Sequence, residues 1–169
     1  MAKYNVNTDL VNGDDLFLYI YEPSTAITAT TQLTSGNTNV IAFATSCALQ
    51  VDGETIDTSN KMSCRWNATK AGRNGYSVSA DALYTDNSGL YSFDSLLADM
   101  VAGDAVGWAI AQCTSAETCS AQEFLIDSSK VVAMGEGYIT SLSLNAGSNE
   151  IASCSISISG SGEIITPTA

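Results

Sequence analysis

Two segments near the C-terminal end alternate strictly between apolar residues and small hydroxyl residues, running from Gly137 to Leu144 and from Ala152 to Ile158. A period of two is typical of a strand that buries one face, so the segments predict a pair of half-buried strands. The faces of the later segment are Cys154, Ile156 and Ile158 against Ser153, Ser155, Ser157 and Ser159. Those of the earlier one are Tyr138, Leu142 and Leu144 against Ser141, Ser143 and Asn145, with Ile139 as an exception. Exposed strand faces usually carry Lys and Glu, so a neutral hydroxyl face indicates an unusually smooth surface.

The rest of the chain predicts further strands and one helix. The expected strands are Asp15–Tyr21, Val40–Val51, Tyr76–Tyr84, Val106–Gln112 and Glu123–Ile126. The first of these is apolar on both faces, so protein should cover both of its sides. A helix is expected at about 92–102, with its apolar face made of Phe93, Leu96, Leu97, Met100 and Val101. The fold class is therefore mainly β, an antiparallel β-sandwich or barrel with one flanking α-helix, in a single domain at 1–169.

The charge of the chain is one-sided, with eighteen acidic against six basic residues and a formal net charge of −12. Most of the basic residues lie in a long connection at about 52–75, which we expect to be a loop with at most a short β segment at 64–68. They are Lys61, Arg65, Lys70 and Arg73. Because polyanions bind through Lys and Arg, the acidic remainder should repel nucleic acid and anionic membranes.

Several kinds of chemistry have no residues to support them. The chain has no histidine, which removes Ser-His-Asp and Cys-His arrangements and most zinc sites. No phosphate-binding loop, signal peptide or membrane-spanning run is visible, so we expect no cofactor, no metal, no membrane anchoring and no enzymatic activity. The five cysteines suggest reduced thiols in a protein made in the cytoplasm, although Cys113 and Cys119 could pair. Trp66 and Trp108 are expected to be packing residues, with an interface as the alternative for Trp66.

The order of several segments resembles the major tail protein, or tail tube, family of long-tailed bacteriophages. The matching pieces are NGDDLFLYI, VDGETIDTSNKMSCRW, GYSVSADALYT, SFDSLLADMVAGDAV and MGEGYITSLSLNAGSNEIASCSISISGSGEI. Together they cover most of the chain. The segments at 24–39 and 116–122 depart from the family pattern, and the roles of the predicted loops at 24–39 and 114–122 stay open.

The resemblance implies a virion tail protein, made in the host bacterial cytoplasm, whose hexameric rings stack into a hollow tube. The viral genome would pass through the lumen without specific binding, after the tape-measure protein. The lumen barrel would be shared between subunits, and a loop between early strands would reach the neighbouring ring. Expected partners are further copies of the chain, the tape-measure protein, the tail terminator and the tail-tip proteins.

A tube lumen must not hold DNA, so neutral or acidic faces are the candidates for its lining. The candidate lumen-facing residues are Ser141, Ser143, Ser153, Ser155, Ser157 and Ser159, with Ala42, Ala44, Ser46 and Ala48 as a second set. The candidates for contact between rings are Lys61, Arg65, Trp66, Lys70 and Arg73; a solvated loop is the equal alternative. The candidates for contact between subunits are Leu16, Phe17, Tyr19 and Tyr21.

Other functions stay open from the residues. A tube-like ring component of a contractile injection system, a tail terminator or a baseplate protein would share these features. A glycan-binding β-sandwich is a more remote alternative, since it would need an exposed aromatic platform. Whether the tail contracts, which host is infected and which serine face is luminal are not determined, because a shift of one residue in register exchanges the two faces of a strand.

Overall fold

The computed structural model describes residues 11, 13–23, 33, 37–63, 66–86, 91–113 and 126–166. Seven strands form one antiparallel sheet in the order β2-β1-β5-β6-β7-β4-β3. Its members are β1 (Leu16–Tyr21), β2 (Asn39–Val40), β3 (Ala44–Asp57), β4 (Thr69–Leu83), β5 (Val106–Cys113), β6 (Ile126–Asn145) and β7 (Ser153–Ile165). A 3-10 turn, η1 (Gly13–Asp15), precedes β1, and a helix, α2 (Phe93–Ala102), joins β4 to β5. The expected fold class, mainly antiparallel β with one helix, is confirmed.

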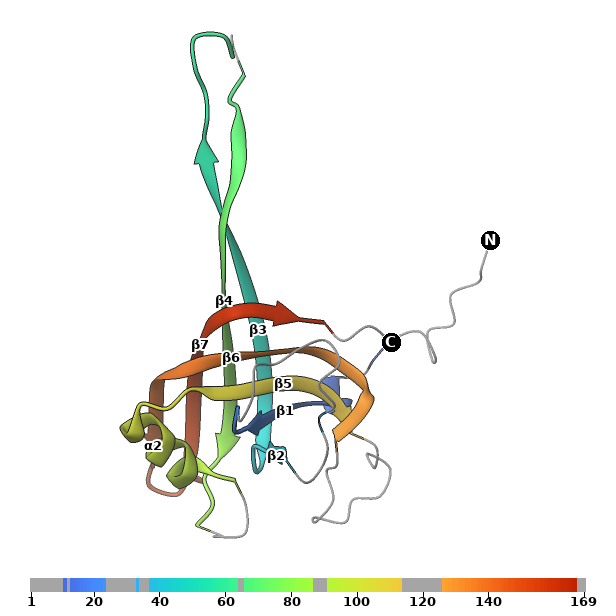
Figure 1. Ribbon diagram of the computed structural model, residues 1–169. Coiled ribbons are helices and arrows are strands. Elements are labelled where there is room, and N and C mark those ends of the chain that lie inside the picture. The colour runs from blue at the N-terminus through green and yellow to red at the C-terminus, as the bar shows by residue number, and fades with distance from the viewer. Residues whose placement is uncertain are drawn as a thin grey trace.

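The sheet is bent onto itself but does not close into a barrel. β3 and β4 cross the direction of β1 and β5 (Figure 1). The edge strand β3 approaches β1, where the Cys47 thiol lies 3.8 Å from the Leu16 carbonyl oxygen. The main core fills the bend and includes residues of β1, β4, β5, β7 and α2, namely Leu18, Ile20, Val78, Ala80, Leu96, Trp108, Ile156 and Ile158. The expected packing role of Trp108 is therefore confirmed.

Both faces of β1 are covered by protein, as its two-sided apolar sequence predicts. Leu18 and Ile20 belong to the main core, whereas Tyr19 and Tyr21 pack in a second cluster with Leu33. Every side chain from Leu18 to Tyr21 is buried, although β1 lies next to the short edge strand β2.

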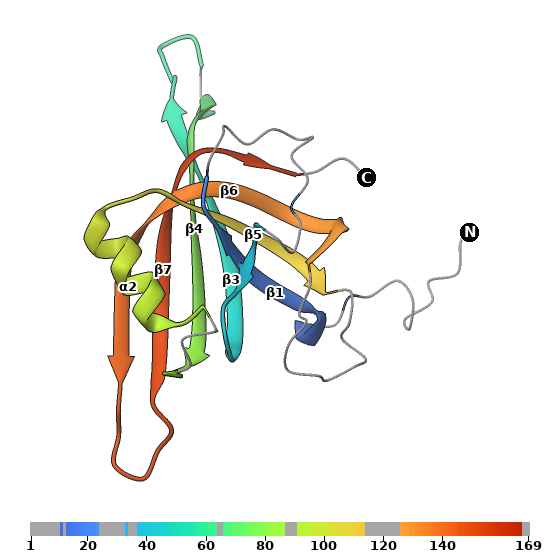
Figure 2. The same cartoon turned by 60° about the horizontal axis from the view of Figure 1, so that its bottom comes forward.

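The helix α2 packs against β6 (Figure 2) and has the expected ends. Ser92 precedes it in an extended conformation, and Gly103 ends it at a φ of 75°, where its N–H donates to the carbonyls of Asp99 and Met100. Glycine adopts this left-handed conformation without steric cost. Only Leu96 of the helix is fully buried. The expected apolar face is thus half covered: the exposed members are Leu97, Met100 and Val101.

The terminal pair forms as expected, with β6 and β7 antiparallel and joined by a short connection. A register irregularity between Ile139 and Ser141 shifts the alternation of β6. Ile139 therefore points into the core, and Tyr138, opposite Ser159, is exposed. The assignment of Tyr138 to the apolar face was wrong, because a bulge changes the period that the sequence pattern assumes to be constant.

The strand expected at 40–51 is two strands. β2 ends at Val40 and β3 begins at Ala44, with Phe43 between them at a φ of 53°. This left-handed residue lies in the turn between the two strands. Ala42, a candidate for the lumen lining, is therefore buried, and Phe43 is exposed.

The basic loop expected at 52–75 is mostly strand. β3 continues to Asp57 and β4 begins at Thr69, so the two form a long hairpin that projects from the body (Figure 1). The β segment expected at 64–68 is wrong for Trp66–Ala68, which form no strand, and Cys64 and Arg65 lie outside the described residues. Because neither face of the projecting part of this hairpin is buried, its sequence has no alternation of apolar and polar residues from which strands could be predicted.

Other expectations are only partly within the described residues. β5 matches the strand expected at 106–112, whereas Ile126 starts a continuous strand to Asn145 instead of ending a short one. The loop at 114–122, Cys119 and most of 24–39 lie outside the described residues, so the Cys113–Cys119 pairing stays a prediction. Within the described residues, no helix is long and apolar enough to cross a membrane.

Candidate functional surfaces

One face of the sheet carries the hydroxyl residues of four neighbouring strands, and we call it the hydroxyl wall. It lies on β6, β7, β4 and β3, on the side opposite the main core. The register sets its residues in cross-strand rows: Tyr138, Ser159, Ser77 and Gln50; Ser141, Ser157, Ser79 and Ala48; Ser143, Ser155, Asp81 and Ser46. Ser153 extends the wall beside Asn145 and Leu83. The wall is therefore uncharged except at Asp81.

Asp81 is held as a carboxylate by two hydroxyl groups. Ser155 Oγ donates to one carboxylate oxygen at 2.7 Å, and Ser46 Oγ donates to the other at 2.9 Å. Both hydrogen bonds hold the pKa of Asp81 below its usual value, and the bond from Ser155 has the larger effect. At neutral pH the wall therefore carries one fixed negative charge per chain.

Most of the residues predicted for a lumen fall on this wall. Those it brings together are Ser141, Ser143, Ser153, Ser155, Ser157, Ser159, Ser46 and Ala48. Ala42 and Ala44 are exceptions, since Ala42 is buried and Ala44 packs against the main core opposite Ala82. A register shift between Ala44 and Ser46 reverses the face on which Ala44 lies.

Sequence reasoning missed the contribution of β4, which supplies Ser77, Ser79 and Asp81 between the two predicted hydroxyl sets. Their alternation with buried Val78 and Ala80 was the available signal. That these residues complete one surface follows only from the pairing of β4 with β3 and β7, which brings distant segments together.

The wall ends at two open edges. β3 is the last strand of the sheet. On the other side, β5 pairs with β6 only as far as Gly137, so within the described residues Ile139–Asn145 pair with β7 alone. Such edges expose rows of N–H and C=O groups that can pair with another chain.

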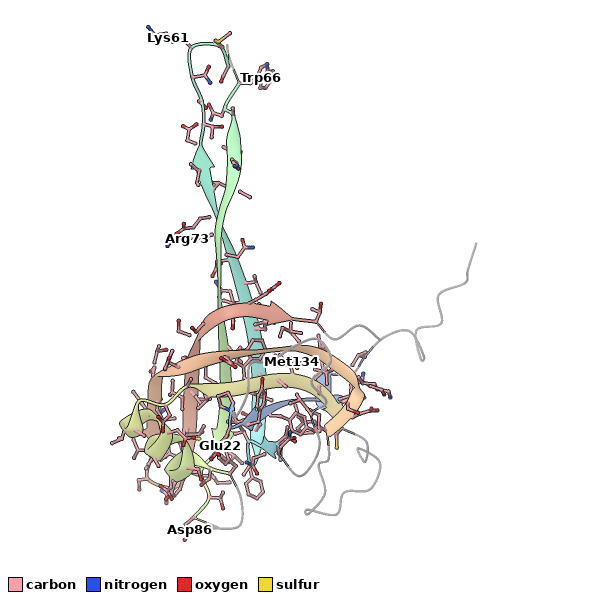
Figure 3. The ribbon with its side chains drawn as sticks, viewed as in Figure 1. Glu22, Lys61, Trp66, Arg73, Asp86 and Met134 are labelled. Atoms are coloured by element: carbon pink, nitrogen blue, oxygen red, sulfur yellow. The ribbon has the colours of Figure 1, made fainter. Side chains whose placement is uncertain are left out.

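The β3–β4 hairpin forms a projecting arm, which we define as residues 51–75. Every described residue from Val51 to Asn60 is exposed. Lys61 and Trp66 lie at its far end and Arg73 nearer the body (Figure 3). Trp66 is 83% exposed, so its expected packing role within the chain is wrong.

The described residues at the tip of the arm form short-range hydrogen bonds although they are exposed. The Thr58 N–H donates to the Ala68 carbonyl at 2.8 Å, and the Ala68 N–H donates to Ser59 Oγ at 3.0 Å. The Trp66 N–H donates to the Ser63 carbonyl at 3.2 Å. The backbone of Trp66 is therefore held to Ser63 while its indole is exposed.

The predicted contact residues separate into two groups. Lys61, Lys70 and Arg73 are exposed on the arm together with Trp66, while Arg65 lies outside the described residues. Of the residues predicted for a subunit interface, Tyr19 and Tyr21 are buried in the chain's own second cluster, and Leu16 and Phe17 are partly buried. The structure thus gives the two tyrosines a core role.

A hollow of about 330 Å³ lies beside the C-terminal end of α2. Its lining includes Glu22, Tyr91, Asp99 and Asp104. Tyr91 Oη donates to the Asp99 carboxylate, and burial, followed by this hydrogen bond, raises the pKa of Tyr91. Among the described residues no cluster of His, Cys, Asp and Glu could hold a metal ion.

The described residues thus form a β-rich fold with a hydroxyl wall and a long arm. The family model described as "Phage tail tube protein" matches residues 11–166. The chain therefore belongs to the phage tail tube protein family, and the expected resemblance is confirmed. No curated protein matches the sequence significantly.

Solved structures share this fold. The tail of an empty gene transfer agent particle, refined with C6 symmetry, is 19% identical with a TM-score of 0.66, covering 95% of this chain and 100% of that one. The SPP1 tail tube is 13% identical with a TM-score of 0.64, covering 95% of this chain and 80% of that one.

Proposed function

We propose that this tail tube protein forms hexameric rings that stack into the tube of a virion tail, with the hydroxyl wall lining the lumen. The observation that carries the proposal is the wall itself: its cross-strand rows, drawn from four paired strands, contain no Lys or Arg and one carboxylate. The C6 symmetry of the similar gene transfer agent tail supports the ring size. The role is structural, without catalysis.

The chemistry of the wall suits the passage of DNA. Lys and Arg hold DNA through its phosphates, so a wall of hydroxyls offers no strong phosphate contact. Asp81 would repeat around the ring as a collar of negative charge, which repels the duplex at close range. The viral genome would therefore pass through the lumen without specific binding.

The open edges of the wall offer a way to close the ring. In a ring, β3 of one subunit would lie next to the Ile139–Asn145 part of β6 in its neighbour. Antiparallel or parallel pairing there would satisfy the exposed backbone groups and join the walls into one shared barrel. Closure of this kind also explains how long exposed edges avoid unwanted association.

The projecting arm would join successive rings. Its basic residues, with Arg65, would face the acidic body of a subunit in the next ring. Complementary charges of this kind fix register and speed assembly more than they add affinity. Tape-measure, tail terminator and tail-tip proteins are the further partners that we propose for the assembled tube.

Electron microscopy of the purified full chain tests the proposal directly. We expect hollow rings with six-fold symmetry, or tubes, and a density map that places the hydroxyl wall at the inner surface. A homogeneous monomer at high protein concentration, or tubes lined by α2, would contradict it.

A further inference from the structure

We infer that the tip of the arm docks on the exposed face of α2 in a subunit of the neighbouring ring. The inference rests on the proposed function, since it names the surface that receives the arm. The occupant is a second copy of this chain, and the contact pairs an aromatic and basic tip with an apolar and acidic helix.

The position of the arm limits what it can reach. The arm continues β3 and β4 beyond the wall, and the opposite ends of these strands meet at Ala44 and Ala82. In a stack, the arm must therefore run along the wall of the next subunit, on its hydroxyl face or on the other side. The hydroxyl face has to stay clear as the lumen, so the arm lies on the side that α2 covers.

The length of the arm fits a contact along the body rather than at its rim. The exposed part of β3, residues 51–57, spans about 23 Å at roughly 3.3 Å per residue. The part of the same strand that lies in the body, residues 44–50, has the same number of residues. An arm as long as the wall carries its tip past the near rim of the next subunit.

The outward face of α2 is apolar and uncovered. Val101 is 78% exposed, and Leu97 and Met100 are also exposed. Their spacing places them on one side of the helix, next to the turn that contains Leu96. A helix whose apolar stripe is only half buried within its own chain indicates a contact with another chain.

The charge of this region complements the arm. The last turn of α2 contains no basic residue, although the carbonyl end of a helix favours a cation. Asp104 follows the helix, and Glu22 and Asp99 line the adjacent hollow. The arm tip offers Lys61, which is exposed close to Trp66 (Figure 3).

Crosslinking tests the contact in assembled tubes. The double variant Trp66→Cys/Val101→Cys, in a Cys64→Ser/Cys119→Ser background, should give a ladder of oxidised multimers from tubes and none from isolated rings. The matched control Trp66→Cys/Val132→Cys places the second thiol on another exposed valine, in β6, and should give no ladder. A ladder from the control alone, or from neither variant, would overturn the inference.

Charge reversal separates the inference from the proposed function. Lys61→Glu should raise the protein concentration needed for tubes by about tenfold while rings still form. Adding Asp104→Lys should restore tube formation, whereas adding Asp86→Lys, at another exposed acidic site, should not. Normal tubes from Lys61→Glu would overturn the proposed docking site and leave the tube function intact. The same holds if Asp104→Lys and Asp86→Lys both restore tubes, or if neither does. Absence of rings and tubes from the unaltered chain would instead contradict the proposed function.

Discussion

Gly160 lies directly beneath the ring of Tyr76. A Cβ atom placed on Gly160 would come within 2.1 Å of Tyr76 Cε2, so the ring occupies the space of the missing side chain. Tyr76 in turn packs against Trp108, with 5.5 Å between the ring centroids and 58° between the ring planes. Its hydroxyl lies 2.7 Å from the Glu136 carbonyl oxygen. Because Tyr76 stands where the arm enters the body, this contact ties the base of the arm to β6 and β7.

Gly160→Ala should destabilise the chain by about 1–3 kcal/mol, because the new methyl group overpacks against a buried ring. The matched control is Gly75→Ala, where an added Cβ would meet nothing within 4 Å. We expect the control to change the free energy of unfolding by less than about 0.5 kcal/mol. Urea unfolding of the unassembled chain measures both, and equal stability of the two variants would contradict the packing account.

Alkaline pH should destabilise the chain through its buried tyrosines. Burial raises the pKa of Tyr21 and of Tyr91 in the folded state, whereas the unfolded chain keeps the ordinary value of about 10. As pH rises, these tyrosines therefore lose their protons first in the unfolded state. Their contribution to the free energy of unfolding is complete below about pH 10 and is lost as pH rises through the folded-state pKa. The urea concentration at the midpoint of unfolding should be lower at about pH 11 than at about pH 8. Tyr91→Phe should make this decrease smaller.

A lysine on the hydroxyl wall should make the lumen hold DNA. Ser141→Lys adds a cation at an exposed wall position, repeated in every subunit, and should allow short duplex DNA to sediment with open tubes at low salt. The control is Ser128→Lys, at an exposed position on the same strand outside the wall. Equal binding by the two variants would argue against a luminal wall.

Reversal of the arm's charge should block the joining of rings without unfolding the chain. The double variant Arg65→Glu/Arg73→Glu should stay folded, by circular dichroism, and fail to form tubes, because the arm would repel an acidic body. The control is Lys130→Glu, a charge reversal on β6 outside the arm, where Lys130 Nζ lies 3.9 Å from Asp127 Oδ2. Normal tubes from the double variant would favour the alternative of a solvated arm.

Substitutions at two residues of α2 should separate folding from assembly, one lowering the stability of the chain and the other weakening tube formation. Leu96→Ala removes a buried side chain and should cost about 2–5 kcal/mol of folding free energy. Val101→Ala removes an exposed one and should leave stability within about 0.5 kcal/mol while weakening tube formation. Chemical denaturation and turbidity of the same preparations distinguish these effects, and a Val101→Ala variant with normal tubes would count against docking on α2.

Local pattern alone was enough for the elements whose faces differ in polarity. The alternation around Ile156 predicted β7, and the spacing of Phe93 and Leu96 predicted α2, because burial of one face imposes a period on the chain. The order of these elements also pointed to the tail tube family. The arm could not be predicted in this way, since both of its faces meet solvent and its strands are held by pairing with each other.

The sequence by itself determined that this chain is a mainly β protein with a neutral hydroxyl face and a segregated basic segment. Only the tertiary structure decided which residues share that face. A left-handed Phe43 and bulges near Thr45 and Thr140 reverse the side on which later residues lie, and each excludes or adds residues to the hydroxyl wall. Such irregularities depend on contacts between strands distant in the chain, so no local pattern contains them.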